Sequence, residues 1–245
     1  MSRAGTVLSL PDVVLAEVIG EAFDLVWLDM EHGGIGVRDI APLAIALRSA
    51  RCEAHVRVPS GQSDVLSAAM DAGVDGIVMP GAEDAQALAA VLRRFDYPPV
   101  GRRGYGPRRA GGYGRDPRLP SRPACTVQVE SPAAVACAPA LAALPGVDAV
   151  VVGCADLAME LHGEVVLGTG ELRAAVGAVE RAAAGPGVAF GVAGGDPAAL
   201  AALCTAPPDL LVHSVDVRLI ARAADAAAAA VRSSLRPEVL AHGGD

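Results

Sequence analysis

The chain has 245 residues and a formal net charge of −8, and its 20 basic residues are all arginine, because the sequence contains no lysine. The acidic balance, with no basic tract beyond one loop, argues against a nucleic-acid-binding surface. The absence of lysine excludes Schiff-base chemistry on a lysine side chain, because arginine does not supply a deprotonated amine. Carbonyl chemistry in this protein therefore needs a metal ion or a set of hydrogen bonds to stabilise the developing negative charge.

Cysteine usage and hydropathy favour a cytoplasmic protein. The five cysteines are an odd number without CxxC spacing, which is typical of reduced thiols rather than of a disulfide framework. The N-terminus lacks a basic segment followed by a long apolar run, so we expect no signal peptide. Charges, glycines or prolines interrupt every apolar stretch, so we expect no transmembrane segment and no membrane partner.

Short apolar segments alternate with longer helical patterns along the chain. Strands are expected at residues 6–10, 23–29, 54–58, 76–79, 125–130, 148–152, 188–192 and 209–213. Helices are expected from the Pro11-Asp12 pair, over residues 37–50, 62–72 and 84–95, and in the alanine-rich segments that follow each of the last four strands. The last of these helices is expected at residues 217–232.

Eight strand-then-helix units in a chain of this length predict an α/β fold, a (β/α)8 TIM barrel that forms a single domain over residues 1–245. A doubly wound open sheet is the structural alternative. The rhythm breaks once, over residues 96–123, which are rich in Pro, Gly and Arg and predict a lid, a binding loop or a subunit contact. The polar tail after residue 236 is expected to fray.

Polar residues gather where the predicted strands end, which is where barrel enzymes place their catalytic groups. Glu130 and Asp156 follow neighbouring strands, and two hard oxygen ligands suit Mg²⁺ or Mn²⁺ with open positions for water and substrate. The alternative is that Glu130 is an ordinary charge at a strand end and that Asp156 is the N-cap of the next helix. Backbone N–H groups at Ala155 and Asp156 are also candidates to bind an anion.

His32 is the best candidate for acid–base chemistry. Asp29 lies three residues earlier, at the end of the same strand, where it can orient the imidazole and raise its basicity. The alternative is a structural histidine in a glycine-rich turn. Arg57 ends another strand, and a buried arginine needs an anionic partner. That partner is either the carboxylate of a neighbouring residue or the carboxylate and enolate of a substrate. Trp27, within a strand, is interpreted as a packing residue.

At these residues the chain resembles the HpcH/HpaI aldolase family of metal-dependent class II pyruvate aldolases, which includes 2,4-dihydroxyhept-2-ene-1,7-dioate aldolase and 2-dehydro-3-deoxyglucarate aldolase. The matching segments are FDLVWLDMEHG, HVRVP, DAGVDGIVMPGAEDA, YPPVGRRGYG, VQVES, DAVVVGCADLA and SVDVRLIARAADA. They occur in the family's order over about residues 23–226, and the combination of DxEH, RVP, QxE and GxxDL is specific. One departure is Cys154, at a position where the family usually has proline.

The resemblance implies a TIM barrel of the phosphoenolpyruvate/pyruvate type, often assembled as a homo-oligomer such as a trimer or hexamer. It implies that Glu130 and Asp156 hold a divalent metal (Mg²⁺, Mn²⁺ or Co²⁺). It also implies that His32, paired with Asp29, moves protons through bound water, and that Arg57 steadies the oxygens of pyruvate. Gly153, Ala155 and Asp156 are the further positions expected to contact substrate.

The predicted activity is that of an aldolase that forms or cleaves 4-hydroxy-2-oxo acids through a pyruvate enolate. Its expected partners are a small 2-oxo acid and an aldehyde, whose identity stays open. One alternative keeps the same site and generates the enolate by decarboxylation of oxaloacetate, as in enzymes of natural-product biosynthesis. The other is a non-catalytic subunit that binds a 2-oxo acid or serves in assembly. The five polar residues together (Asp29, His32, Arg57, Glu130 and Asp156) favour an enzyme.

Overall fold

The computed structural model describes residues 2–59 and 63–235. Eight parallel strands pair in chain order and close into a barrel, since the last strand also pairs with the first. The strands are β1 (Arg3–Leu8), β2 (Leu25–Asp29), β3 (Glu53–Arg57), β4 (Gly76–Met79), β5 (Ala124–Val129), β6 (Ala149–Gly153), β7 (Ala189–Gly194) and β8 (Leu210–Val215). The predicted (β/α)8 barrel is confirmed, and each strand lies within three residues of its predicted limits.

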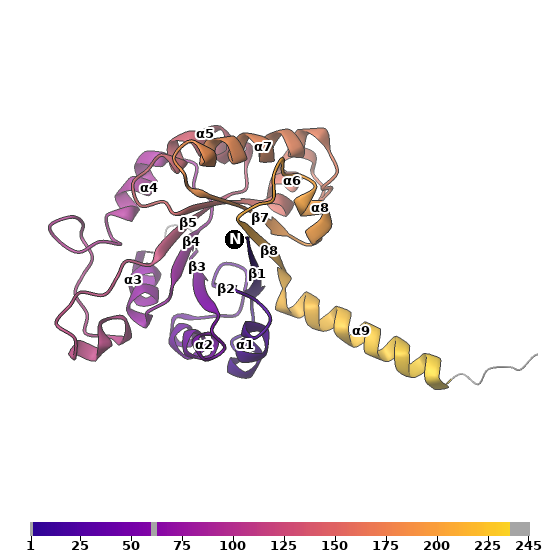
Figure 1. The fold of residues 1–245 in the computed structure, drawn as a ribbon, viewed down its shortest axis with the longest axis horizontal. Helices are drawn as coiled ribbons and strands as arrows, with labels where there is room; N and C mark the ends of the chain where they lie inside the picture. The colour runs from indigo at the N-terminus through magenta and orange to yellow at the C-terminus, as the bar shows by residue number, and fades with distance from the viewer. Residues whose placement is uncertain (1, 60–62, 236–245) are drawn as a thin grey trace, which may run out of the picture.

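Helices surround the barrel in the order expected from the sequence (Figure 1). They are α1 (Val13–Gly20), α2 (Val37–Ser49), α3 (Ser63–Ala72), α4 (Ala85–Leu92), α5 (Pro132–Ala142), α6 (Cys154–His162), α7 (Gly170–Ala184), α8 (Pro197–Ala201) and α9 (Asp216–Leu235). Several helices begin at a capping residue. Asp12 accepts a hydrogen bond from the N–H of Leu15, and Asp84 accepts one from that of Gln86, which satisfies amides that have no partner within the helix.

Apolar side chains fill two layers. A small cluster occupies the interior of the barrel and consists of Leu25, Trp27, Val78, Val151, Leu210 and Val212. A much larger cluster lies between the strands and the surrounding helices. Trp27 is 1% exposed, so its predicted packing role is confirmed. Its ring belongs to the cluster inside the barrel, and burial of so large a side chain contributes strongly to stability.

The last helix, α9, extends away from the barrel (Figure 1). Asp216 is the only buried residue along the 20 residues of this helix. Its apolar side chains, which include Val217, Ile220 and Val231, are exposed. Helices of globular proteins are stabilised chiefly by packing of an apolar face, which α9 does not find on its own barrel.

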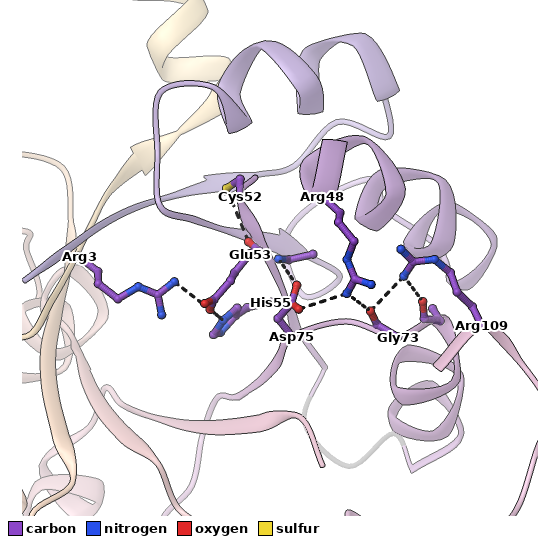
Figure 2. A network of polar contacts seen from close by, with 10 residues as sticks. Arg3, Arg48, Cys52, Glu53, His55, Gly73, Asp75 and Arg109 are labelled. Carbon is purple, nitrogen blue, oxygen red and sulfur yellow. Dashed lines mark hydrogen bonds and ion pairs between the residues drawn. The ribbon is translucent and has the colours of Figure 1, made fainter. Parts of the chain in front are cut away.

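Figure 2 shows a network of charged side chains at the amino-terminal ends of the strands. Arg3 Nη2 lies 2.8 Å from Glu53 Oε2, and His55 Nε2 lies 3.0 Å from the same oxygen. Arg48 Nη2 donates to Asp75 Oδ1 at 3.2 Å. These contacts join the starts of β1 and β3 and the segment before β4, at the opposite end of the barrel from the carboxyl ends of the strands.

The segment expected to be irregular, residues 96–123, contains one short 3₁₀ helix, η1 (Arg109–Gly114). Arg109 Nη1 donates to the carbonyl oxygens of Ala72 and Gly73 and so ties the segment to the end of α3. The tail predicted after residue 236 lies outside the described residues. Within the described ranges, no helix is both long enough and apolar enough to cross a membrane.

Candidate active site at the carboxyl ends of the strands

Asp29 and Arg57 form a buried pair at the mouth of the barrel. They are register partners at the ends of β2 and β3, so their side chains start side by side. Arg57 Nε donates to Asp29 Oδ1 at 3.0 Å, and Nη2 donates to Oδ2 at 2.8 Å. Burial favours the neutral form of Asp29, but the Arg57 guanidinium outweighs it and lowers the pKa of the carboxyl. Both groups are therefore ionised and held in a fixed orientation.

The expected pairing of Asp29 with the imidazole of His32 is wrong. Asp29 Oδ1 instead accepts hydrogen bonds from the backbone N–H groups of Glu31 and His32, at 3.0 and 3.3 Å. The reason is the parallel register, which gives the Asp29 carboxylate a guanidinium partner on β3. The side chain of His32 is 71% exposed, and its Nε2 lies 3.8 Å from Glu31 Oε2. His32 thus stands at the rim, with Glu31 as its nearest carboxylate.

Glu31 links this pair to the rest of the rim. Its Oε2 lies 3.4 Å from Arg57 Nη1, so Arg57 contacts two carboxylates. Burial favours the neutral form of Arg57, but the hydrogen bonds and charge of Asp29, together with the charge of Glu31, outweigh it and raise the pKa of Arg57 above its ordinary value.

Glu130 follows β5 and is held by two neighbours. Its Oε1 accepts from the N–H of Gly81 at 2.9 Å, and its Oε2 accepts from Gln128 Nε2 at 2.7 Å. Burial raises the pKa of Glu130 to about 7, and the nearby charges of Glu31 and Asp156 add to the rise. This carboxylate therefore lies in a region where negative charge is not fully compensated.

Asp156 lies in the first turn of α6, which begins at Cys154 with Gly153 as its N-cap. The alternative interpretation of Asp156 as the N-cap is therefore wrong. The helix starts directly at the end of β6, so the N–H groups of its first turn, including those of Ala155 and Asp156, have no partner within the helix. The Cys154 thiol is buried, and burial raises its pKa to about 12, so it is an unreactive packing group.

A cavity of about 180 Å³ opens at this end of the barrel. Four residues expected at the site line it, namely Arg57, Gly153, Ala155 and Asp156, and Gln128, for which no role was predicted, lines it as well. The remaining lining comes chiefly from β7, β8 and the start of α9. Larger cavities of about 580 and 570 Å³ lie around Arg3 at the other end, but catalytic sites of such barrels form at the carboxyl ends of the strands.

The carboxylates at the mouth suit a divalent cation. Glu130 and Asp156 follow adjacent strands, and the pKa of Glu130 is raised by burial first and then by the nearby charges of Glu31 and Asp156. Among the residues that the structure describes, no group of three or more His, Cys, Asp or Glu side chains is arranged to hold a metal. Two protein carboxylates are nevertheless an ordinary set for Mg²⁺, which usually keeps waters or substrate oxygens as further ligands. The residues present therefore fit the ion.

Asp216, which follows β8 and begins α9, has a structural role. Its carboxylate accepts from the N–H and hydroxyl of Ser9 at 2.9 and 2.6 Å and from the N–H of Leu10 at 2.9 Å. It is fully buried and fixes the loop after β1 against the start of α9. The sequence analysis assigned no role to Glu31 or to Arg218, although Arg218 lines the cavity. Both residues follow the end of a strand within four residues, and this position is the feature of the sequence that could have marked them as candidates.

The profile of the HpcH/HpaI aldolase/citrate lyase family matches residues 8–207. The chain belongs to this family. A 4-hydroxy-2-oxovalerate aldolase of Rhodococcus jostii is 36% identical over 65% of this chain, and the match spans 64% of the relative's length. A hydroxypyruvate/pyruvate aldolase of Paraburkholderia phytofirmans is 32% identical over 94% of this chain and 93% of its own.

A solved structure supports the same assignment. The crystal structure of an HpcH/HpaI aldolase/citrate lyase family protein from Burkholderia cenocepacia superposes on this chain with a TM-score of 0.87 and 32% sequence identity. The match covers 94% of this chain and 95% of the Burkholderia chain. The predicted family is therefore confirmed.

Proposed function

We propose that this protein is a divalent-metal-dependent aldolase that forms or cleaves 4-hydroxy-2-oxo acids through a pyruvate enolate. The observation that carries the proposal is the buried Asp29–Arg57 pair, which lies beside the Glu31, Glu130 and Asp156 carboxylates in a chain without lysine. Relatives named as aldolases of 2-oxo acids, at 32–36% identity, support the same reaction class.

The reaction needs an electron acceptor for the carbon next to the keto group. In the aldol direction, C3 of pyruvate loses a proton, its electron pair attacks the carbonyl carbon of an aldehyde, and the aldehyde oxygen takes up a proton. The reverse direction breaks the same carbon–carbon bond. Because no lysine is present to form an iminium, the negative charge of the enolate must be stabilised electrostatically.

Arg57 supplies part of this stabilisation. Two of its nitrogens are occupied by Asp29, which fixes the plane of the guanidinium. The guanidinium also lines the cavity, where it is placed to orient the keto and carboxylate oxygens of a 2-oxo acid. The N–H groups of Ala155 and Asp156, at the start of α6, are the proposed second contact for the carboxylate.

Glu130 and Asp156 are the residues proposed to hold the metal. A bound divalent ion polarises the keto group as a Lewis acid and offsets the charge of the enolate. Gln128 and the N–H of Gly81 orient the Glu130 carboxylate from the protein side. Titration of chelator-treated enzyme with Mg²⁺, Mn²⁺ or Co²⁺ identifies the ion that supports the activity.

His32 is the proposed group that moves the proton. Its imidazole stands at the rim and is reached by solvent, which lets the proton exchange with water. Asp29 accepts a hydrogen bond from the backbone N–H of His32. This contact fixes the turn that carries His32 but does not orient its imidazole ring. The carboxylate nearest to the imidazole is that of Glu31, whose Oε2 lies 3.8 Å from His32 Nε2.

We also propose that the protein is a homo-oligomer. Apart from the buried Asp216, the side chains of α9 are not buried by their own barrel. The residues Val217, Ile220, Ala224, Ala228, Val231 and Leu235 recur at the spacing of one helix face. A second copy of the chain is the proposed cover for that face.

The decisive test of the function is a screen of aldehydes against pyruvate with enzyme that was first treated with a chelator. Addition of Mg²⁺, Mn²⁺ or Co²⁺ is expected to restore formation of a 4-hydroxy-2-oxo acid. Asp156→Asn is expected to lower this activity by a factor of about 10²–10³, a typical loss for a group that stabilises developing charge. Glu160→Gln, one turn later on α6 and exposed, is the matched control. Full activity of Asp156→Asn, or of the metal-free enzyme, would contradict the proposal.

A further inference from the structure

The cavity at the barrel mouth has a second side, away from the proposed metal ligands. This side is built by β7, β8 and the start of α9 and includes Gly194, Gly195, Ser214 and Arg218. Three buried polar atoms on the cavity lining have no hydrogen-bond partner among the described residues: Trp27 Nε1, Gln128 Oε1 and Ser214 Oγ. Buried polar groups are nearly always hydrogen-bonded, so these atoms indicate that the cavity takes a polar ligand.

Arg218 supplies a positive charge on this side. Within residues 2–59 and 63–235 it forms no ion pair, whereas Arg57 has both Asp29 and Glu31 as partners. Asp156, at the opposite side, is the only carboxylate that lines the cavity among the residues that the structure describes. The β7–β8 side of the cavity therefore carries a solvent-exposed guanidinium without an ion-pair partner among the described residues and the unpartnered hydroxyl of Ser214, and the unpartnered Trp27 indole, from β2, lines the same cavity.

The turn from β8 into α9 holds Arg218 in this place. Asp216, two residues earlier, accepts four hydrogen bonds from Ser9, Leu10 and Val217, which fix the first turn of the helix. Ser214 has a φ of 62°, a conformation that costs free energy in a residue other than glycine and that tends to occur where function requires it.

Gly195 has no Cβ, and the Arg218 side chain occupies the space that a Cβ would take. A Cβ added at Gly195 would lie 2.9 Å from Arg218 Nη1, so the guanidinium rests directly over the backbone after β7. The side chain is thus directed across the cavity wall, although α9 as a whole extends away from the barrel.

We infer that Arg218 determines acceptor specificity and selects an aldehyde that carries a carboxylate. The inference rests on the proposed function, in which Arg57 and the start of α6 hold the 2-oxo acid. The aldehyde then enters from the β7–β8 side, its carboxylate meets the Arg218 guanidinium, and the Ser214 hydroxyl donates to the same group. The small volume of the cavity restricts the acceptor to a short chain.

The test compares acceptors of similar length with and without a carboxylate. Pyruvate is offered with glyoxylate or succinic semialdehyde, and in parallel with acetaldehyde or pentanal, and kcat/KM is measured for each aldehyde. Arg218→Gln is expected to lower the ratio of carboxylated to uncharged acceptor about 10- to 100-fold, as for the loss of one charge-assisted hydrogen bond. Arg218→Lys is expected to restore part of the ratio because it keeps the charge.

Arg222→Gln is the matched control, since it removes the same charge from the next turn of α9 and does not line the cavity. The inference is overturned if Arg218→Gln and Arg222→Gln show the same ratio as the unaltered enzyme. A failure of the unaltered enzyme to join pyruvate to any of the four aldehydes contradicts the proposed function itself, and the inference with it. If the enzyme joins pyruvate to the aldehydes but Arg218→Gln leaves the ratio of carboxylated to uncharged acceptor unchanged, the proposed function stands and only the role of Arg218 is overturned.

Discussion

Asp29 accepts four hydrogen bonds, two from the Arg57 guanidinium and two from the backbone of the turn that follows β2. The same carboxylate therefore balances a buried charge and shapes the turn that carries Glu31 and His32. In a low-dielectric surrounding such a pair is costly to separate, because removal of one partner leaves the other charge buried and uncompensated.

Asp29→Asn is expected to lower the free energy of unfolding at neutral pH by about 3 kcal/mol, because the Arg57 charge stays buried with only Glu31 beside it. Urea denaturation measures the loss. The control is Asp116→Asn, which breaks a fork of the same geometry between Asp116 and Arg118 on the exposed surface and is expected to change stability little. Equal stability of Asp29→Asn and the unaltered protein would contradict this account.

Gly153 illustrates how a small residue makes room for the site. An added Cβ there would lie 2.9 Å from Gln128 Nε2 and 3.2 Å from Glu130 Cβ. Gly153→Ala is therefore expected to turn the Glu130 carboxylate and to lower kcat/KM about tenfold or more, because small displacements of catalytic groups are costly. Gly168→Ala, where an added Cβ meets no atom within 4 Å, should leave kcat/KM unchanged. Similar activity in the two variants would argue against the placement of Glu130.

At the scale of elements, β3 has a stabilising ion pair at its start and a residue of the candidate site at its end. In β3, Glu53 begins the strand within the network of Figure 2, and Arg57 ends it within the site. The hydrogen bond with His55, together with Arg3, lowers the pKa of Glu53 from 4.5 to about 2. Because the folded pKa is lower than the unfolded one, Glu53 stabilises the fold above about pH 4.5, and this contribution is lost as the pH falls toward 2.

Glu53→Gln is accordingly expected to lower the free energy of unfolding at pH 7 by about 1 kcal/mol, a value reduced for screening because the side chain is 44% exposed. The difference from the unaltered protein should shrink as the pH falls below 4.5. Urea titrations at several pH values measure it, with Glu17→Gln, an exposed residue of α1, as the control. A difference that is constant over this pH range would exclude the ion pair as its cause.

The limits of the elements were predictable because apolar runs of four to six residues, each bounded by Gly, Pro or Asp, mark the strands of a parallel barrel. The positions of Arg57, Glu130 and Asp156 at the barrel mouth followed from the same pattern. The partner of Asp29 did not, because Arg57 is 28 residues away and becomes a neighbour only through the register of β2 and β3. The 3₁₀ helix η1 was missed, since left-handed conformations at Gly112 and Tyr113 shape it rather than a periodic apolar pattern.

At the scale of the whole molecule, α9 is the element that one copy of the chain does not bury. The sequence predicts a helix there from its alanine content, but its direction away from the barrel depends on tertiary packing. A helix of 20 residues with an exposed apolar face gains most of its stability from a partner surface. The exposed Val13, Val14 and Val18 of α1 are further apolar residues available to such a partner.

Ile220→Glu is expected to reduce the molar mass measured by light scattering to that of a smaller species, because a charge is placed within the apolar face of α9. Ala226→Glu adds the same charge to the opposite side of the helix and should leave the mass unchanged. If the unaltered protein is a monomer, or if the two variants behave alike, α9 does not serve as the subunit contact.

The central claim is that two carboxylates at the barrel mouth, Glu130 and Asp156, support metal-dependent formation of a pyruvate enolate. Exchange of the C3 protons of pyruvate in deuterated buffer, followed by NMR, measures this step without any aldehyde. The account predicts exchange that stops with a chelator, returns with Mg²⁺ or Mn²⁺, falls by about 10²-fold or more in Glu130→Gln and persists in Glu160→Gln. Exchange that is equally fast in chelator-treated enzyme, or in Glu130→Gln, would contradict it.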